Sequence, residues 1–233
     1  MRGFLEQMRT LTIAGILIGI VLVGGGGRLA MLVLRLTSPN EVRGVTSDDG
    51  FVIGRVTLGG TYNLLQLGAA VGLVGAGAYR LVSPWLAGPG WARRLTTGAA
   101  SGAVVGSILL HADGVDFTLL QPTWLTIGLF IALPCAFGVV IGMAVDRCAR
   151  PASHPSARRR WAVPILLVAV VPATLVVIPI LAVVVAACVA AQRSERVATI
   201  RSSRVYGLAV RMAWMSVAAA GLATVVRDAR AIA

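Results

Sequence analysis

Charged side chains are scarce in this sequence. Only 13% of its 233 residues are charged, 57% are hydrophobic, and the mean hydropathy is +0.85. A soluble globular domain carries roughly 25% charged residues, so this composition excludes that class. Several runs of 18 or more nearly uncharged residues are each long enough to cross roughly 30 Å of hydrocarbon. The sequence therefore predicts an integral membrane protein.

Lysine is missing altogether, and all 21 basic residues are arginines, which leave a net charge of +12. In a soluble chain this balance would point to nucleic acid. In a membrane protein it marks cytoplasmic loops, because basic residues accumulate on that side. We therefore expect no nucleic-acid partner; the expected partners are the lipid bilayer and other membrane-protein subunits. The abundance of alanine, valine and glycine indicates a bacterial genome, and hence the bacterial cytoplasmic (inner) membrane.

Signatures of catalysis and of metal binding are missing too. The sequence has no HExxH, GxSxG or GxxxxGK[ST] motif, and no acid in the middle of an apolar run. Cys135, Cys148 and Cys188 form no CxxC pair, so neither a zinc site nor a disulfide framework is indicated. The loop 111–116 holds one histidine and two aspartates, at a spacing that matches no specific metal site. We expect no cofactor, no metal and no catalytic residue, and the balance is against an enzyme.

The hydropathy pattern predicts a single all-α domain over residues 1–233. It is a polytopic transmembrane bundle of about six helices with a small extracytoplasmic β-hairpin. The basic loop 146–160 and both termini are expected in the cytoplasm. The predicted spans run from about Leu11 to Leu36, Tyr62 to Val82, Leu95 to Leu110, Trp124 to Val145, Ala162 to Ala191 and Val205 to Val226.

The last two spans leave the count open. The run 162–191 is long for one helix and short for two, and its three prolines allow a break. With six spans, the loop 192–204 faces outward with four arginines, against the positive-inside tendency. A re-entrant pair at 162–191, or a last helix lying in the interface, would remove that conflict. Five and seven spans therefore stay open beside six.

Residues 41–57 have strand character. Valine, threonine, isoleucine and phenylalanine are enriched on the two sides of Asp49-Gly50, which is a strong hairpin-turn signal. An isolated two-stranded hairpin is only marginally stable in water, so we expect this one to pack against the bundle.

Three glycines, Gly98, Gly102 and Gly106, recur at every fourth position of the third predicted span. Small residues at this spacing allow two helix backbones to approach closely. We expect this glycine stripe to face another helix, in the second or the fourth span.

Polar side chains gather at the predicted outer end of the bundle. Arg28 and Arg35 share one helical face, and guanidinium groups in a bilayer pair or line a cavity rather than face lipid. Two interpretations stay open: a polar pocket between hairpin and loop, or ion pairs that fasten the hairpin. We predict that Arg35 or Arg28 meets Asp113 or Asp116. The candidate polar cluster comprises Arg28, Arg35, Arg43, Arg55, His111, Asp113, Asp116 and Gln121.

The segments GRVTLGGTYNLLQLGAA, SPWL and DGVDFTLLQPTWL follow one another along the chain. Over about residues 27–145 the sequence resembles an uncharacterised family of bacterial multi-pass integral membrane proteins with a GRxTxGG … DGxDFxLLQPxWL pattern. The resemblance implies a multi-pass helical protein. It brings no known activity, so no functional residue is carried over.

Three functions are compatible with these features. The first is a non-enzymatic scaffold or accessory subunit that presents the hairpin and the loop 111–122 outside. The second is a small transporter or permease that admits an anionic solute along the arginine-bearing face of the first span. The third is a membrane enzyme acting on lipid or envelope precursors, with Asp113 or Asp116 as acid or base.

Overall fold

The computed structural model describes residues 2–42, 44–46, 52, 55–86, 88–111, 114–148 and 203–232, and these are predominantly helical. Four segments are long and apolar enough to cross a membrane, namely Thr10–Thr37, Leu58–Val82, Thr123–Arg147 and Arg204–Ile232. The predicted helical membrane protein is confirmed to that extent, whereas the count of about six spans is not. In chain order the helices are α1 (Arg2–Ile18), η1 (Gly19–Gly25), α2 (Gly26–Thr37), η2 (Asn40–Val42), α3 (Leu58–Val82), α4 (Gly90–Leu109), α5 (Val115–Leu119), α6 (Thr123–Cys148) and α9 (Arg204–Ile232).

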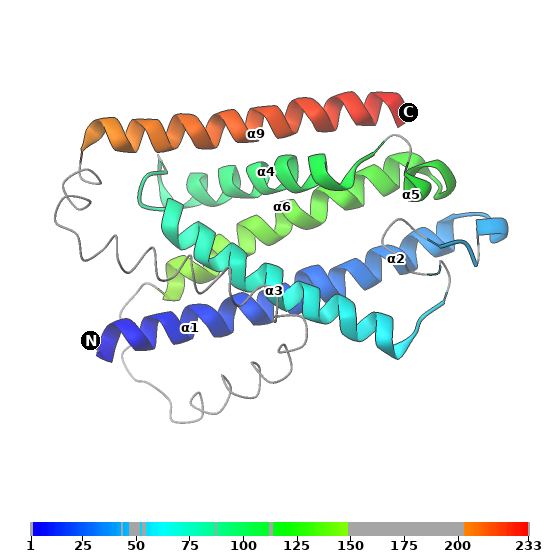
Figure 1. The fold of residues 1–233 in the computed structure, drawn as a ribbon, viewed down its shortest axis with the longest axis horizontal. Coiled ribbons are helices and arrows are strands. Elements are labelled where there is room, and N and C mark those ends of the chain that lie inside the picture. The colour runs from blue at the N-terminus through cyan, green and yellow to red at the C-terminus, as the bar shows by residue number, and fades with distance from the viewer. Residues whose placement is uncertain are drawn as a thin grey trace.

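The first span is one continuous rod through α1, η1 and α2 (Figure 1). Its middle, Gly19–Gly25, is a π-helix, in which N–H groups reach back five residues, as Gly26 does to the carbonyl of Val21. Glycine has a low propensity for the α-helix, so this glycine-rich stretch adopts the wider π-helix. The rod ends where Ser38 becomes extended ahead of Pro39, because proline cannot continue the ladder.

The helix α3 lies across α1 and η1, and the two backbones touch. A β-carbon on Gly15 would lie 2.7 Å from the carbonyl oxygen of Gly72, and one on Gly68 would lie 2.5 Å from that of Gly19. Neither position has room for a side chain. This crossing therefore depends on glycines from both sides. Gly15 and Gly19 lie in the first half of the first span, and Gly68 and Gly72 lie on α3.

The glycine stripe of α4 lies against α6 for most of its length. A β-carbon on Gly98 would lie 2.8 Å from the carbonyl oxygen of Cys135, and one on Gly102 would overlap the sulfur of Cys135. At Gly106 the nearest atom is Cγ2 of Val225 on α9, at 3.2 Å. The helix α4 is therefore packed between α6 and α9 (Figure 1).

The helix α9 runs parallel to α4 along the outside of the bundle (Figure 1). Near its start, the ring of Tyr206 meets that of Trp85 edge-on, with 5.4 Å between centroids. Nε of Arg211 donates to the carbonyl of Trp85 at 2.6 Å. At its other end, Ile232 packs in the apolar cluster that contains Leu110, just past the end of α4. The direction of α9 is therefore fixed at both ends.

These contacts place the two termini at opposite ends of the bundle (Figure 1). At the N-terminal end, Leu11 packs with Tyr79 and Val145, so the start of α1 meets the ends of α3 and α6. At the C-terminal end, Ile232 packs near the end of α4. The prediction that both termini lie in the cytoplasm rests on hydropathy and loop charge, and hydropathy locates a helix without giving its direction. The side of the membrane on which each terminus lies stays a prediction.

Several sequence predictions fall wholly or partly outside the described residues. The run 162–191 lies there, as do residues 149–160 of the basic loop and most of the loop 192–204. The described residues that flank them, at the end of α6 and the start of α9, both lie at the N-terminal end of the bundle.

The predicted hairpin at 41–57 is described only in part. Thr46 and Val52 form a single antiparallel bridge, while Asn40–Val42 make one 3-10 turn. No strand is assigned among the described residues of this segment. The full hairpin stays a prediction, because its turn at 47–51 lies outside them.

Candidate functional site

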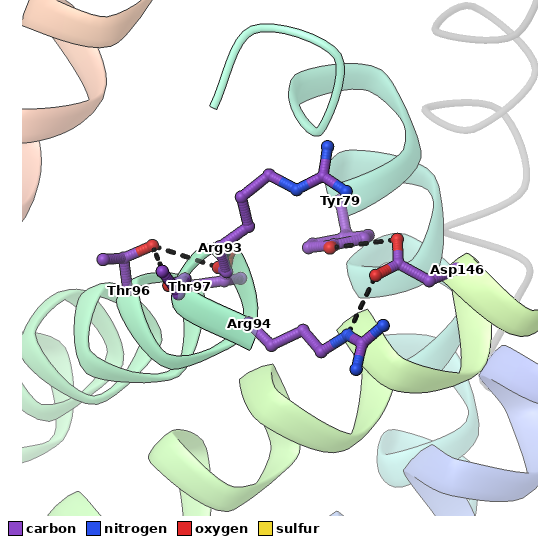
Figure 2. Close-up of polar contacts among 7 residues, drawn as sticks. Tyr79, Arg93, Arg94, Thr96, Thr97 and Asp146 are labelled. Carbon is purple, nitrogen blue, oxygen red and sulfur yellow. Dashed lines mark hydrogen bonds and ion pairs between the residues drawn. The ribbon is translucent and has the colours of Figure 1, made fainter. Parts of the chain in front are cut away.

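One polar cluster joins three helices at the N-terminal end of the bundle, and Figure 2 shows its side chains pointing toward one another. The carboxylate of Asp146, near the end of α6, accepts a hydrogen bond from Nε of Arg94 on α4 at 2.9 Å. It also accepts one from the hydroxyl of Tyr79 on α3 at 3.2 Å. We call Tyr79, Arg94 and Asp146 the carboxylate clamp.

The clamp compensates two unfavourable helix-end charges. Asp146 lies in the last turn of α6 and Arg94 in the first turns of α4. Each charge has the sign that the helix dipole disfavours at that end. Their side chains are 17% and 26% exposed, so both are partly removed from water and the pairing counts for more than at an open surface.

Arg93 lies beside the clamp without joining it (Figure 2). Its Nε atom is buried and has no hydrogen-bond partner. The carbonyl of Arg93 accepts a hydrogen bond from the Thr97 hydroxyl at 2.7 Å. The first two turns of α4 therefore carry two adjacent arginines, of which one is bound to a carboxylate.

A cavity of about 80 Å³ lies beside Tyr79, between α3, α4, α6 and α9. Ligand pockets are commonly about 300–1,000 Å³, so this cavity is too small for most substrates. Its wall is largely apolar, with Thr97 and Ser101 among the residues that line it. The lining residues are Gly75, Ala78, Tyr79, Val82, Leu86, Thr97, Ser101, Phe137, Ile141 and Trp214.

The described members of the predicted polar cluster lie at the opposite, C-terminal end. Arg28 and Arg35 are on α2, and the Nε atom of Arg35 is buried without a hydrogen-bond partner. Asp116 is in the first turn of α5 and is 6% exposed. Arg55, just before α3, and His111, just after α4, are both exposed. Arg43 and Asp113 lie outside the described residues, as do Asp48 and Asp49, so the contact predicted between Arg35 or Arg28 and Asp113 or Asp116 stays a prediction.

Ser38 joins the end of the first span to the loop before α6. The hydroxyl of Ser38 accepts from the Gln121 N–H at 2.8 Å and donates to the Gln121 carbonyl at 3.2 Å. Leu34 packs with Leu120 in a small apolar cluster directly beneath. The backbone of Gln121, and not its side chain, makes these bonds. The loop before α6 is therefore held in a fixed position against α2.

The described residues offer no group of three or more histidine, cysteine, aspartate or glutamate side chains that could hold a metal ion. Cys135, in the middle of α6, is a free thiol packed at Gly102.

Sequence reasoning missed the clamp, although one signal was present. Asp146 is the one acid in the apolar run 123–148, lies near the end of that run, and is followed directly by Arg147. An acid at a helix C-terminus lacks dipole support, which predicts a cationic partner elsewhere. Nothing local, however, identifies that partner as Arg94, which lies 52 positions away in the chain.

The resemblance of about residues 27–145 to a family of bacterial membrane proteins stays a prediction. No protein family, curated protein or solved structure matches this chain.

Proposed function

We propose that this protein is a non-enzymatic membrane scaffold or accessory subunit, and that its partner binds the C-terminal end of the bundle. The observation that carries the proposal is the fastening of the outer loop by Ser38 and Gln121. A loop held rigid before binding loses less entropy when a partner docks. Exposed side chains flank the fixed point, among them His111 and Leu119.

The proposal includes an orientation in the membrane. Among the described residues, eight arginines lie toward the N-terminal end, namely Arg2, Arg9, Arg80, Arg93, Arg94, Arg147, Arg204 and Arg211. The acids at that end are Glu6 and Asp146. Toward the C-terminal end, five arginines (Arg28, Arg35, Arg55, Arg227 and Arg230) are interspersed with Glu41, Asp116 and Asp228. The positive-inside rule puts the N-terminal end in the cytoplasm. The C-terminus, the loop 111–122 and the predicted hairpin then lie outside the bacterial inner membrane.

The internal contacts support a structural role over a catalytic one. The acid Asp146 is engaged by both Arg94 and Tyr79, and the helix crossings at Gly72 and Gly102 leave no room between backbones. Such a bundle suits a rigid platform.

Site-specific photo-crosslinking in intact membranes tests the proposal. A crosslinking residue at His111 should yield a discrete adduct with another protein, while the same residue at exposed Arg204, on the opposite end, should not. Ser38→Ala frees the loop and should lower the yield at His111. Equal yields at both ends, or lipid adducts alone at His111, would rule out a partner at the C-terminal end.

The anion permease is the second candidate, and one observation favours it. The Nε atom of Arg35 is buried without a hydrogen-bond partner, as expected of a cation that meets a passing anion. Purified protein in liposomes should then take up a radiolabelled anion at a rate that Arg35→Gln abolishes. The scaffold function predicts no uptake by either protein.

A further inference from the structure

The start of α4 brings two guanidinium groups together over one glycine. A β-carbon on Gly90 would lie 3.5 Å from Nη2 of Arg94 and 3.9 Å from Nη2 of Arg93. Both side chains therefore fold back toward the first residue of their own helix. We call Gly90, Arg93 and Arg94 the arginine notch.

The charge in the notch is only half balanced by the described residues around it. The carboxylate of Asp146 engages Nε of Arg94. Arg93 has a buried Nε atom without a hydrogen-bond partner, although it lies beside the same cluster (Figure 2). A guanidinium presents five donors and cannot lose its proton. A partly buried arginine of this kind needs an anion to complete its bonding.

The backbone at the notch adds donors of the same kind. The first N–H groups of a helix have no partner within the helix, and α4 begins at Gly90 after Pro89, whose side chain makes no cap hydrogen bond. Gly90 leaves the approach to these groups free of a side chain. Together with the dipole of a 20-residue helix, they favour a negatively charged oxygen.

The surroundings of the notch indicate where that oxygen comes from. Trp91, next to Gly90, is 65% exposed, and Trp85 packs on Tyr206 at the same end of the bundle. Tryptophan gathers at the headgroup level of membranes. The exposed Trp91 therefore indicates that the notch lies at the depth of the lipid headgroups. In the orientation proposed above it faces the cytoplasm, where basic pockets between helices bind acidic headgroups.

We propose that the arginine notch binds the phosphate of an anionic phospholipid headgroup. Arg93 supplies a forked pair of donors to the phosphate oxygens. Arg94 shares its guanidinium between this phosphate and Asp146, and the first backbone N–H groups of α4 complete the site. The bound lipid thereby ties the start of α4 to the carboxylate clamp and, through it, to α3 and α6. This site lies at the end of the bundle opposite the partner surface proposed above and does not depend on it.

The test compares lipid binding by variants of the intact protein. Native mass spectrometry of the detergent-solubilised protein counts lipid adducts after incubation with phosphatidylglycerol or with phosphatidylcholine. The wild type should retain phosphatidylglycerol over phosphatidylcholine, and Arg93→Gln should weaken that retention roughly fivefold or more. Arg230→Gln removes an equal charge at the opposite end and should leave retention unchanged. Arg93→Lys, which keeps the charge and loses the fork, should fall between wild type and Arg93→Gln.

Controls separate binding in the notch from a loss of folding and from a general attraction to positive charge. Thermal unfolding of lipid-free Arg93→Gln should match that of the wild type, while the stabilisation by added phosphatidylglycerol should be lost. Equal loss of lipid in Arg93→Gln and Arg230→Gln would overturn the proposal, because the attraction would then be one of net charge. Displacement of the lipid by inorganic phosphate at equal concentration would overturn the lipid as the ligand. Retention of phosphatidylglycerol unchanged in Arg93→Gln would overturn the site itself.

Discussion

Replacing Asp146 with asparagine removes the charge of the carboxylate clamp while keeping its shape. The asparagine carbonyl can still accept from Tyr79, so the loss is concentrated on the bond to Arg94, 2.9 Å long. Breaking a buried ion pair costs about 3–5 kcal/mol, and an exposed one about 0–1 kcal/mol. The side chains of Arg94 and Asp146 are 26% and 17% exposed. An intermediate loss of about 2 kcal/mol is therefore expected.

Thermal unfolding in detergent, followed by circular dichroism, measures this loss. For a chain of this size, 2 kcal/mol corresponds to a fall in Tm of about 4–8 °C. The matched control is Asp228→Asn, because Asp228 pairs with Arg227, whose side chain is 75% exposed. That control should unfold at the temperature of the wild type, because an ion pair of so exposed a side chain is screened by water.

A double-mutant cycle isolates the pair itself. Arg94→Gln and Asp146→Asn should each destabilise the protein, and the double variant should be less destabilised than their sum by about 1–2 kcal/mol. A coupling energy near zero, or a Tm for Asp146→Asn equal to that of Asp228→Asn, would refute the reasoning that this contact fastens the three helices.

Three further predictions concern helix packing, the candidate polar cluster around Arg35 and Asp116, and the orientation in the membrane. Gly102→Leu should destabilise the bundle by about 3 kcal/mol or more in thermal unfolding, because the new side chain must displace Cys135. The control Gly128→Leu, which has open space around it, should leave the stability unchanged. Equal effects of the two variants would show that the glycine stripe does not set the distance between α4 and α6. Arg35→Asp and Asp116→Arg should each lower the yield of folded protein, and the double variant should recover it. Additive losses in the double variant would exclude an ion pair between Arg35 and Asp116. Protease or antibody applied outside intact cells should reach a tag on the C-terminus and not one on the N-terminus, and the reverse accessibility of both tags would invert the proposed orientation.

The sequence by itself determined the class of the protein and most of its helix positions. Four of the predicted spans agree with the observed α1–α2 rod, α3, α6 and α9 within a few residues at most ends, because apolar length and proline punctuation are local properties. The end of the first span at Ser38 follows directly from Pro39. The α4 glycines could likewise be singled out from their spacing alone.

Only the tertiary structure decided how those helices run and which side chains meet. The parallel course of α9 along α4 depends on contacts such as Tyr206 with Trp85, and hydropathy is the same for a helix read in either direction. The clamp joins Tyr79, Arg94 and Asp146 from three helices, and the loop before α6 is held by Ser38. Sequence patterns report on neighbours within a turn or two, whereas these partners are brought together by glycine-mediated helix crossings, whose geometry depends on the whole bundle.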